Sequence, residues 1–190
     1  MGLVMGYLAT SLDGFIAGPH DELAWLQEPR ISGLPLAAGP WADRESDGLE
    51  FDEFLAGVGC VVMGRRTYDV VRAMPGPWAY GDKPMLIVTS RPLDEPPAHV
   101  DRADAGVEQA IRQAREVAGD LDVYVDGGQT VRAALDGGLL DRLVVTVLPT
   151  ALGEGIPLFA GLRDRADFTV QDVRRWGPGF VQLHLTTQKI

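Results

Sequence analysis

The sequence is poor in metal-binding residues, because its 190 residues include one cysteine, Cys60, and three histidines, His20, His99 and His184. A single cysteine excludes an internal disulfide bond, which suits the reducing cytosol, so we expect a cytoplasmic protein. These four residues lie far apart in the sequence and match no metal-ligand spacing. We therefore expect no metal site.

Positive charge is also scarce, with 17 Lys and Arg against 27 Asp and Glu and a net charge of -10 at pH 7. An acidic surface repels nucleic acid and anionic membranes, so we expect neither as a partner. No apolar run approaches the roughly 20 residues that a membrane-spanning helix needs. These absences favour a protein that acts on small molecules.

Short apolar segments alternate with helical patterns along most of the chain. Strands are expected at 2–9, 60–64, 84–90, 122–128 and 140–149, followed by an antiparallel hairpin at 168–187. Helices are expected at 46–57, 66–74, 107–119 and 129–138, and a long loop at 18–45. This alternation predicts one α/β domain, residues 1–190, with a mostly parallel mixed sheet, helices on both of its faces and the C-terminal hairpin at its end.

Residues suited to phosphate binding follow three of the expected strands. In an open α/β sheet, ligands bind beyond the carboxyl ends of the strands. Glycine lets the backbone approach a ligand closely, a helix start exposes free N–H groups, and arginine binds phosphate with its planar fork. The three segments are Gly64-Arg65-Arg66-Thr67, Thr89-Ser90-Arg91 and Gly127-Gly128-Gln129-Thr130. Each alone is also typical of a solvated turn, but the three together in an acidic chain favour a dinucleotide site.

Five segments carry a resemblance to a known family: ATSLDGFIAG, VVMGRRTYD, LIVTSRP, VYVDGGQTVRAAL and LLDRLVVTVLPTALGEGIPLF. Over nearly its whole length the chain resembles the dihydrofolate reductase superfamily. Within it, the chain is most similar to the reductase (C-terminal) domain of the bifunctional riboflavin-biosynthesis deaminase-reductase. The resemblance implies a dihydrofolate-reductase-like fold, NADPH as the cofactor and hydride transfer to a pyrimidine- or pterin-like substrate. The zinc motif of the deaminase half is absent.

The resemblance also implies roles for individual residues. Arg65, Arg66 and Thr67 would hold the 2′-phosphate and the pyrophosphate of the cofactor. Thr89, Ser90 and Arg91 would line its adenosine end, and Ala9 and Ile16 would flank the nicotinamide. Residues 127–130 would contact the pyrophosphate, and the peptide bond within the Gly127-Gly128 pair would be cis.

The substrate side departs from both relatives. No residue fills the position of the acid that binds the pteridine ring in dihydrofolate reductases, and Asp69 comes too early to match the acid of the riboflavin-type reductase. Asp13 and Glu154 are the candidate proton donors, although each could simply shape its glycine-containing turn, and a water molecule could protonate the substrate instead. A closed loop over the nicotinamide would raise the pKa of Asp13 toward neutrality. Trp25 and Phe51 are candidates to stack on a flat substrate, or else they belong to the core.

We therefore expect an NADPH-dependent reductase that resembles the 5-amino-6-(5-phosphoribosylamino)uracil reductase of riboflavin biosynthesis. The alternatives are a dihydrofolate reductase and a catalytically inactive nucleotide-binding protein. The resemblance also implies a homodimer, because relatives in the riboflavin reductase branch pair through the terminal strands of the sheet. The hairpin at 168–187 is rich in apolar residues, and an exposed edge strand must be covered, paired or charged. Arg174 and Arg175 supply some charge there, so a monomer is the alternative.

Overall fold

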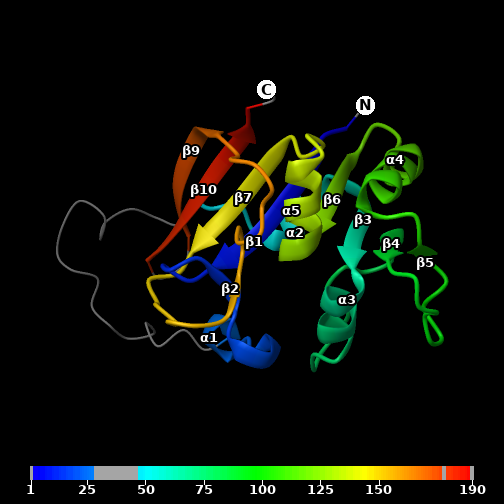
Figure 1. Ribbon diagram of the computed structural model, residues 1–190, viewed down its shortest axis with the longest axis horizontal. Helices are drawn as coiled ribbons and strands as arrows, with labels where there is room; N and C mark the ends of the chain where they lie inside the picture. Colours follow the sequence, from blue (N-terminus) through cyan, green and yellow to red (C-terminus); the bar gives the residue numbers. More distant parts are fainter. Residues whose placement is uncertain (1, 28–46, 177–178, 189–190) are drawn as a thin grey trace.

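The structure is a computed structural model that describes residues 2–27, 47–176 and 179–188 of the chain. Within these ranges the main sheet has eight strands in the order β5-β4-β3-β6-β1-β7-β10-β9 (Figure 1). The strands are β1 (Val4–Thr10), β3 (Val58–Gly64), β4 (Met85–Val88), β5 (Val100–Ala103), β6 (Asp122–Asp126), β7 (Arg142–Val147), β9 (Phe168–Trp176) and β10 (Phe180–Thr187). Neighbours from β5 to β7 pair in parallel, whereas β10 pairs antiparallel with both β7 and β9.

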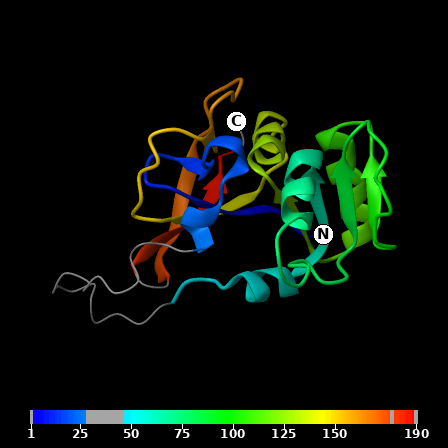
Figure 2. The same ribbon diagram turned by 90° about the horizontal axis from the view of Figure 1, so that it is seen from below.

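Helices cover both faces of this sheet. The helices α4 (Val107–Ala118) and α5 (Gly128–Asp136) pack on one face, and α2 (Phe51–Ala56) and α3 (Arg65–Arg72) pack on the other. Figure 2 shows α5 and α2 on opposite sides of the sheet. The predicted α/β fold, with its mostly parallel mixed sheet and C-terminal antiparallel hairpin, is therefore confirmed.

Strand β3 explains why the inner strands read as continuous apolar runs. The side chains of Cys60 and Val62 belong to the core that includes α4 and α5, and those of Val61 and Met63 belong to the core under α2 and α3. All four are fully buried. A parallel strand that is covered on both faces needs apolar residues at every position, so it shows no polar alternation.

Two segments differ from the expected pattern. Strand β5 was not predicted, because Asp101 and Arg102 in its middle are exposed and only its first and last residues are buried. The loop expected at 18–45 contains a short 3-10 helix, Pro19–Asp21, and the helix α1 (Ala24–Gln27). Residues 28–45 of that loop lie outside the described residues.

A second, two-stranded sheet lies beside the first. Strand β2 (Phe15–Ala17) pairs antiparallel with β8 (Ile156–Pro157), so the segment after β1 meets the segment after β7. Within the described ranges, no helix is long and apolar enough to span a bilayer.

Candidate functional site

A cavity of about 360 Å³ lies beyond the carboxyl ends of β3, β6 and β1, which are neighbours in the sheet. This is the edge of an open α/β sheet at which ligands bind. Ten of the residues predicted from the sequence line the cavity: Ala9, Ile16, Phe51, Gly64, Arg66, Thr67, Gly127, Gly128, Gln129 and Thr130. The structure thus brings most of the predicted cofactor residues together in one place.

Two helix starts meet at this cavity. Helix α3 begins after Gly64 and α5 begins after Gly127, and no described side chain caps either helix. A Cβ atom on Gly64 would lie 3.1 Å from Oγ1 of Thr130, and one on Gly127 would lie 2.2 Å from Oγ1 of Thr67. The turn before each helix therefore packs against the other helix, and the first N–H groups of both lie in one small region. Such groups, together with the helix dipoles, favour a phosphate.

The turn before α5 differs from the expected one. Every described peptide bond is trans, so the predicted cis bond within the Gly127-Gly128 pair is wrong. The chain turns instead at Gly127, whose φ of 90° is readily open only to glycine. The N–H of Gly127 donates a hydrogen bond of 2.7 Å to Oδ1 of Asp126, which fixes this geometry.

The two neighbouring arginines have different surroundings. Arg65 pairs with Asp69 at 2.8 Å, donates to the carbonyl oxygen of Pro92 at 2.7 Å, and lies outside the cavity lining. Arg66 lines the cavity and pairs with Asp21 at 2.7 Å. Of the predicted arginine pair, Arg66 therefore faces the cavity and Arg65 does not.

The segment after β4 lies farther out. Arg91 lines a second, outer hollow of about 660 Å³, which it shares with Arg66 and Asp21. Thr89 is buried, and its Oγ1 accepts a hydrogen bond of 3.1 Å from the N–H of Arg91. Ser90 is exposed and lines neither space. Within this segment the structure brings Arg91 to the same surface as Arg66, and leaves Thr89 and Ser90 outside it.

A buried carboxyl group that was not predicted as a site residue lies in the cavity wall. Asp126, the last residue of β6, is 6% exposed, and its Oδ2 accepts a hydrogen bond from the hydroxyl of Tyr80. Burial raises the pKa of Asp126, against the smaller opposing effect of hydrogen bonds from Tyr80 and Tyr124. Burial and the charge of Asp126 also raise the pKa of Tyr80. All three side chains line the cavity, but the Tyr124 hydroxyl donates to the carbonyl oxygen of Tyr7 at 2.9 Å. The carboxyl group of Asp126 and the hydroxyl of Tyr80 are therefore the pair available for proton exchange with a ligand.

Aromatic rings surround this carboxyl group. The ring of Phe51 meets that of Tyr80 edge-on at a centroid distance of 6.0 Å and that of Tyr124 at 6.3 Å. Tyr7 lies 5.6 Å from Phe51. Because all four rings line the cavity, Phe51 lies where a flat ring could stack, and it stays a candidate for that role.

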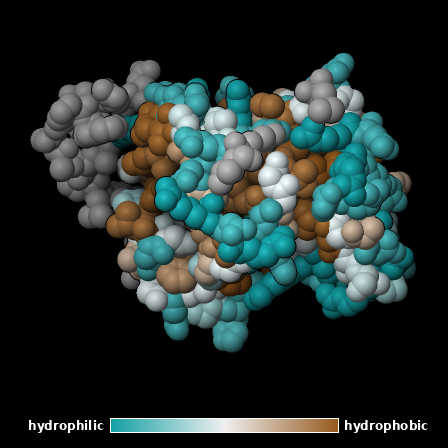
Figure 3. All heavy atoms as spheres, turned by 45° about the horizontal axis from the view of Figure 1, so that its top comes forward, coloured by the Kyte–Doolittle hydropathy of each residue, from teal (hydrophilic) through white to brown (hydrophobic). Residues whose placement is uncertain are grey.

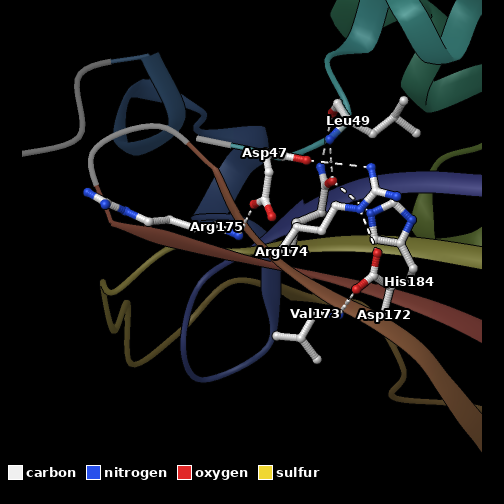
Figure 4. A network of polar contacts seen from close by, with 8 residues as sticks. Asp47, Leu49, Asp172, Val173, Arg174, Arg175 and His184 are labelled. Atoms are coloured by element: carbon white, nitrogen blue, oxygen red, sulfur yellow. Dashed lines mark hydrogen bonds and ion pairs between the residues drawn. The ribbon is translucent and has the colours of Figure 1, made fainter. Parts of the chain in front are cut away.

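The segment that leads to Phe51 is held by the closing hairpin (Figure 4). Gln182 is fully buried, accepts a hydrogen bond of 2.7 Å from the N–H of Leu49, and donates one of 3.1 Å to the carbonyl oxygen of the same residue. The carboxylate of Asp47 accepts a hydrogen bond of 2.9 Å from the N–H of Arg175. These bonds fix the entry to α2 against β9 and β10, and with it the position of Phe51.

Asp13 has the opposite electrostatics to those expected of a proton donor. Its carboxylate accepts hydrogen bonds from the hydroxyl of Ser11 at 2.6 Å and from the N–H groups of Gly153 at 2.7 Å and Leu152 at 3.1 Å. The bond from Ser11 and then those from Gly153 and Leu152 lower the pKa of Asp13 to about 2. The expected rise in pKa is therefore wrong. Asp13 ties two loops together and lies outside the cavity lining.

Two other predicted residues also lie outside the cavity lining. Glu154 is exposed in the turn before β8. Trp25 is buried against Leu148 and Phe180, in a small core beside the main one. Trp25 therefore fills the core, which was the alternative interpretation of this residue, and does not stack on a ligand in this cavity.

The residues that the prediction missed are joined by contacts between distant parts of the chain. The alternation in DVYVD does place Tyr124 and Asp126 on one face of β6, and an aspartate at the end of a buried strand is uncommon. That signal was available and could have been used. No local pattern, in contrast, points to Tyr80 or Asp21 as residues of the cavity wall.

Comparison with known proteins agrees with this architecture. The family model described as the RibD C-terminal domain matches residues 3–182. The uncharacterized protein YwjB of Bacillus subtilis (strain 168) is 28% identical over 178 residues, which cover 94% of each chain. The uncharacterized protein YyaP of the same organism is 23% identical over 188 residues, which cover 93% of this chain and 90% of that one.

Solved structures share the same fold. A protein of Shewanella sp. PV-4 named for riboflavin biosynthesis is 27% identical, with a TM-score of 0.78 over 98% of this chain and 99% of its own. The diaminohydroxyphosphoribosylaminopyrimidine deaminase/5-amino-6-(5-phosphoribosylamino)uracil reductase of Thermotoga maritima is 16% identical, with a TM-score of 0.65. This chain spans 57% of that longer protein, and at this identity the likeness concerns the fold alone.

Proposed function

The chain belongs to the RibD C-terminal domain family, and from that premise we propose that it is an NADPH-dependent reductase. Its substrate would be a pyrimidine- or pterin-like small molecule, reduced as in the 5-amino-6-(5-phosphoribosylamino)uracil reductase reaction for which the Thermotoga maritima relative is named. We further propose that it acts in the cytoplasm, as a homodimer.

One observation carries the proposal: the uncapped starts of α3 and α5 meet at a single cavity, with Arg66 beside them. Free N–H groups, glycine backbone and one guanidinium form the donor set that a pyrophosphate requires. The same cavity continues past Ala9 and Ile16 to the aromatic wall and Asp126. NADPH therefore fits the residues present, with its phosphates held at the helix starts and its nicotinamide beside Ala9 and Ile16.

NADPH, when bound, supplies a hydride to an electrophilic carbon of the substrate. The aromatic wall that includes Phe51 would orient a flat substrate against the nicotinamide and exclude water. Asp126 would hold a proton at Oδ2, because burial raises its pKa. When Asp126 is protonated, Oδ2–H would donate to the Tyr80 oxygen, which reverses the hydrogen bond that the carboxylate accepts from this hydroxyl. The Tyr80 hydroxyl would then give its own proton to the substrate atom that becomes basic as the hydride arrives, and take the proton of Asp126 in its place. Asp126 thus replaces Asp13 and Glu154 as the proposed proton source.

The test is NADPH consumption by the purified protein, followed by absorbance. The substrates are 5-amino-6-(5-phosphoribosylamino)uracil, its dephosphorylated form and dihydrofolate, and the variants are Asp126→Asn and, as a surface control, Asp167→Asn. We expect a pyrimidine-dependent rate that Asp126→Asn lowers by about 10²-fold or more, the range that general acid catalysis supplies. Asp167→Asn should match the wild type, because Asp167 pairs with Arg165 far from the cavity.

The possible outcomes separate the three functions. A rate with dihydrofolate alone would indicate a dihydrofolate reductase. Tight NADPH binding without turnover of any compound would indicate a nucleotide-binding protein, and would contradict the proposed reaction but not the cofactor site. Failure to bind NADPH would contradict both.

A further inference from the structure

An ion pair stands between the cavity and the outer hollow. The guanidinium of Arg66 lies 2.7 Å from Oδ1 and 3.0 Å from Oδ2 of Asp21. Both residues line the cavity of about 360 Å³ and also the hollow of about 660 Å³ that contains Arg91. The pair is thus a shared wall of the two spaces, and it joins the segment after β2 to the start of α3.

The backbone that presents Asp21 is unusual. His20 and Asp21 have φ values of 59° and 65°, in the left-handed region that residues other than glycine seldom adopt. Such a conformation is strained for a residue with a side chain and persists where its surroundings enforce it. The short turn is closed by the N–H of Gly18, which donates to the carbonyl oxygen of Glu22 at 2.8 Å. Asp21 is therefore held toward Arg66 by a specific local fold.

We infer that this pair is a gate on the path of the cofactor and that Asp21 determines how tightly dinucleotides bind. The inference rests on the proposed function. A ligand that reaches from the cavity into the outer hollow has to part Asp21 from Arg66, and one of its phosphates then takes the place of the carboxylate on the guanidinium. Asp21 competes with that phosphate for Arg66 and also repels it. A phosphate at this position could be the pyrophosphate, which NADH and NADPH share, or the 2′-phosphate, which only NADPH carries.

The substitution Asp21→Asn tests the inference with little structural disturbance. Asparagine tolerates the left-handed backbone as well as aspartate does, and it removes only the charge. The matched control is Asp167→Asn, which removes the same charge from the exposed Arg165–Asp167 pair, outside the lining of both spaces. Dissociation constants are measured by the change in protein fluorescence for NADPH, NADH and reduced nicotinamide riboside, which carries no phosphate.

We expect Asp21→Asn to bind NADPH about two- to fivefold more tightly than the wild type, since an exposed ion pair contributes at most about a factor of this size. If the pyrophosphate contacts Arg66, the affinity for NADH should rise as much as the affinity for NADPH. If the 2′-phosphate contacts Arg66, only the affinity for NADPH should rise. The affinity for the riboside, and all affinities of the Asp167→Asn control, should stay unchanged.

Four results would overturn the inference. Equal NADPH affinity in the wild type and Asp21→Asn would show that Asp21 does not compete with the cofactor, while leaving the proposed function intact. The same gain in Asp167→Asn would assign the effect to net charge and not to the gate. The same gain for the riboside would show that the effect does not depend on a phosphate at Arg66. Absence of dinucleotide binding by the wild type would instead contradict the proposed function, and the inference with it.

Discussion

The hydroxyl of Tyr80 donates a hydrogen bond to Oδ2 of Asp126, although the two residues lie 46 positions apart in the chain. Tyr80 comes from the connection between α3 and β4, whereas Asp126 ends β6. The bond therefore joins the wall of the cavity to the strand at its centre. The partners of this buried carboxyl group, the Tyr80 hydroxyl and the N–H of Gly127, are neutral groups and not cations. Burial therefore dominates and raises the pKa of Asp126.

The raised pKa of Asp126 predicts how stability depends on pH. A carboxyl group whose pKa is higher in the folded protein than the value of about 3.9 in the unfolded chain binds its proton more tightly when folded. The stability that it contributes is fully present below that unfolded value and is lost as the pH rises through the folded pKa. We expect the unfolding free energy of the wild type to fall with rising pH relative to that of Asp126→Asn.

Urea unfolding of both proteins between about pH 4 and pH 8 measures this difference. Loss of a hydrogen bond in Asp126→Asn would lower the unfolding free energy of the variant by the same amount at every pH. The prediction therefore concerns the slope. Parallel curves over the whole range would contradict a raised pKa at Asp126.

Asp13 is predicted to act on structure and not on turnover. Its pKa of about 2 lies below the unfolded value, so the stability that it contributes is present above an unfolded pKa of about 3.9 and is lost as the pH falls toward 2. We expect Asp13→Asn to be less stable than the wild type at neutral pH. As the pH falls from about 4 to about 2, the stability of the wild type should decrease more steeply than that of the variant, because only the wild type has this carboxylate to protonate. Its kcat should stay near that of the wild type. A fall in kcat of about 10²-fold with an intact fold would restore Asp13 as a proton donor.

The two arginines at the start of α3 are predicted to differ in their effect on cofactor binding. Arg66 lines the cavity, whereas Arg65 is tied to Asp69 and to Pro92. A charged hydrogen bond contributes about 1.5–3 kcal/mol, so Arg66→Ala should weaken NADPH binding by roughly 10- to 100-fold. Arg65→Ala should change it by less than about threefold.

The comparison of cofactors extends this prediction. We expect the wild type to bind NADPH more tightly than NADH, because a 2′-phosphate adds charge that Arg66 and Arg91 are placed to receive. Titration of both variants with both cofactors measures the effect. Equal affinity of the wild type for the two cofactors would contradict a contact of the 2′-phosphate with Arg66 and Arg91. Undiminished binding by Arg66→Ala would contradict the assignment of any phosphate to Arg66.

The closing hairpin is predicted to form a dimer contact. Strand β9 is an edge of the main sheet, and Val170, Val173 and Val181 on the hairpin are 56%, 47% and 39% exposed. Figure 3 shows hydrophobic residues gathered on the side of the molecule where Figure 1 places β9 and β10. Light scattering should report about twice 20.5 kDa, and Val173→Lys should shift the protein toward the monomer. A wild-type mass near 20.5 kDa at micromolar concentration would contradict the proposal.

The sequence predicted the parts of the fold that depend on local periodicity. Strands such as β3 and β6 are recognisable because both faces are buried, and α5 begins at a glycine pair that the sequence displays. Strand β5 escaped detection because its exposed centre, Asp101 and Arg102, resembles a loop. Strands that are buried on both faces, such as β3 and β6, could therefore be predicted from the sequence, whereas the partly exposed strand β5 could not.

The candidate site divides in the same way. Gly64, Thr67 and the residues at the start of α5 lie in short motifs, and the structure places them together as the motifs suggested. The contact of Asp126 with Tyr80 and that of Asp21 with Arg66 join segments that are far apart in the sequence. Such contacts depend on the path of the chain through space, which a local pattern does not encode. The same reason explains why Arg65, next to Arg66 in sequence, faces a different partner.

The central claim is that a dinucleotide binds where α3 and α5 begin, and amide NMR of the ¹⁵N-labelled protein titrated with NADPH tests it most directly. The account predicts that the largest shifts fall on the N–H groups of residues 65–67 and 127–130, at the starts of α3 and α5, with little change at residues 119–121, which precede β6 at the opposite edge of the sheet. Arg66→Ala should need a higher NADPH concentration to reach the same shifts. Saturating NADPH that leaves those amides unmoved, or that shifts another surface instead, would contradict the account.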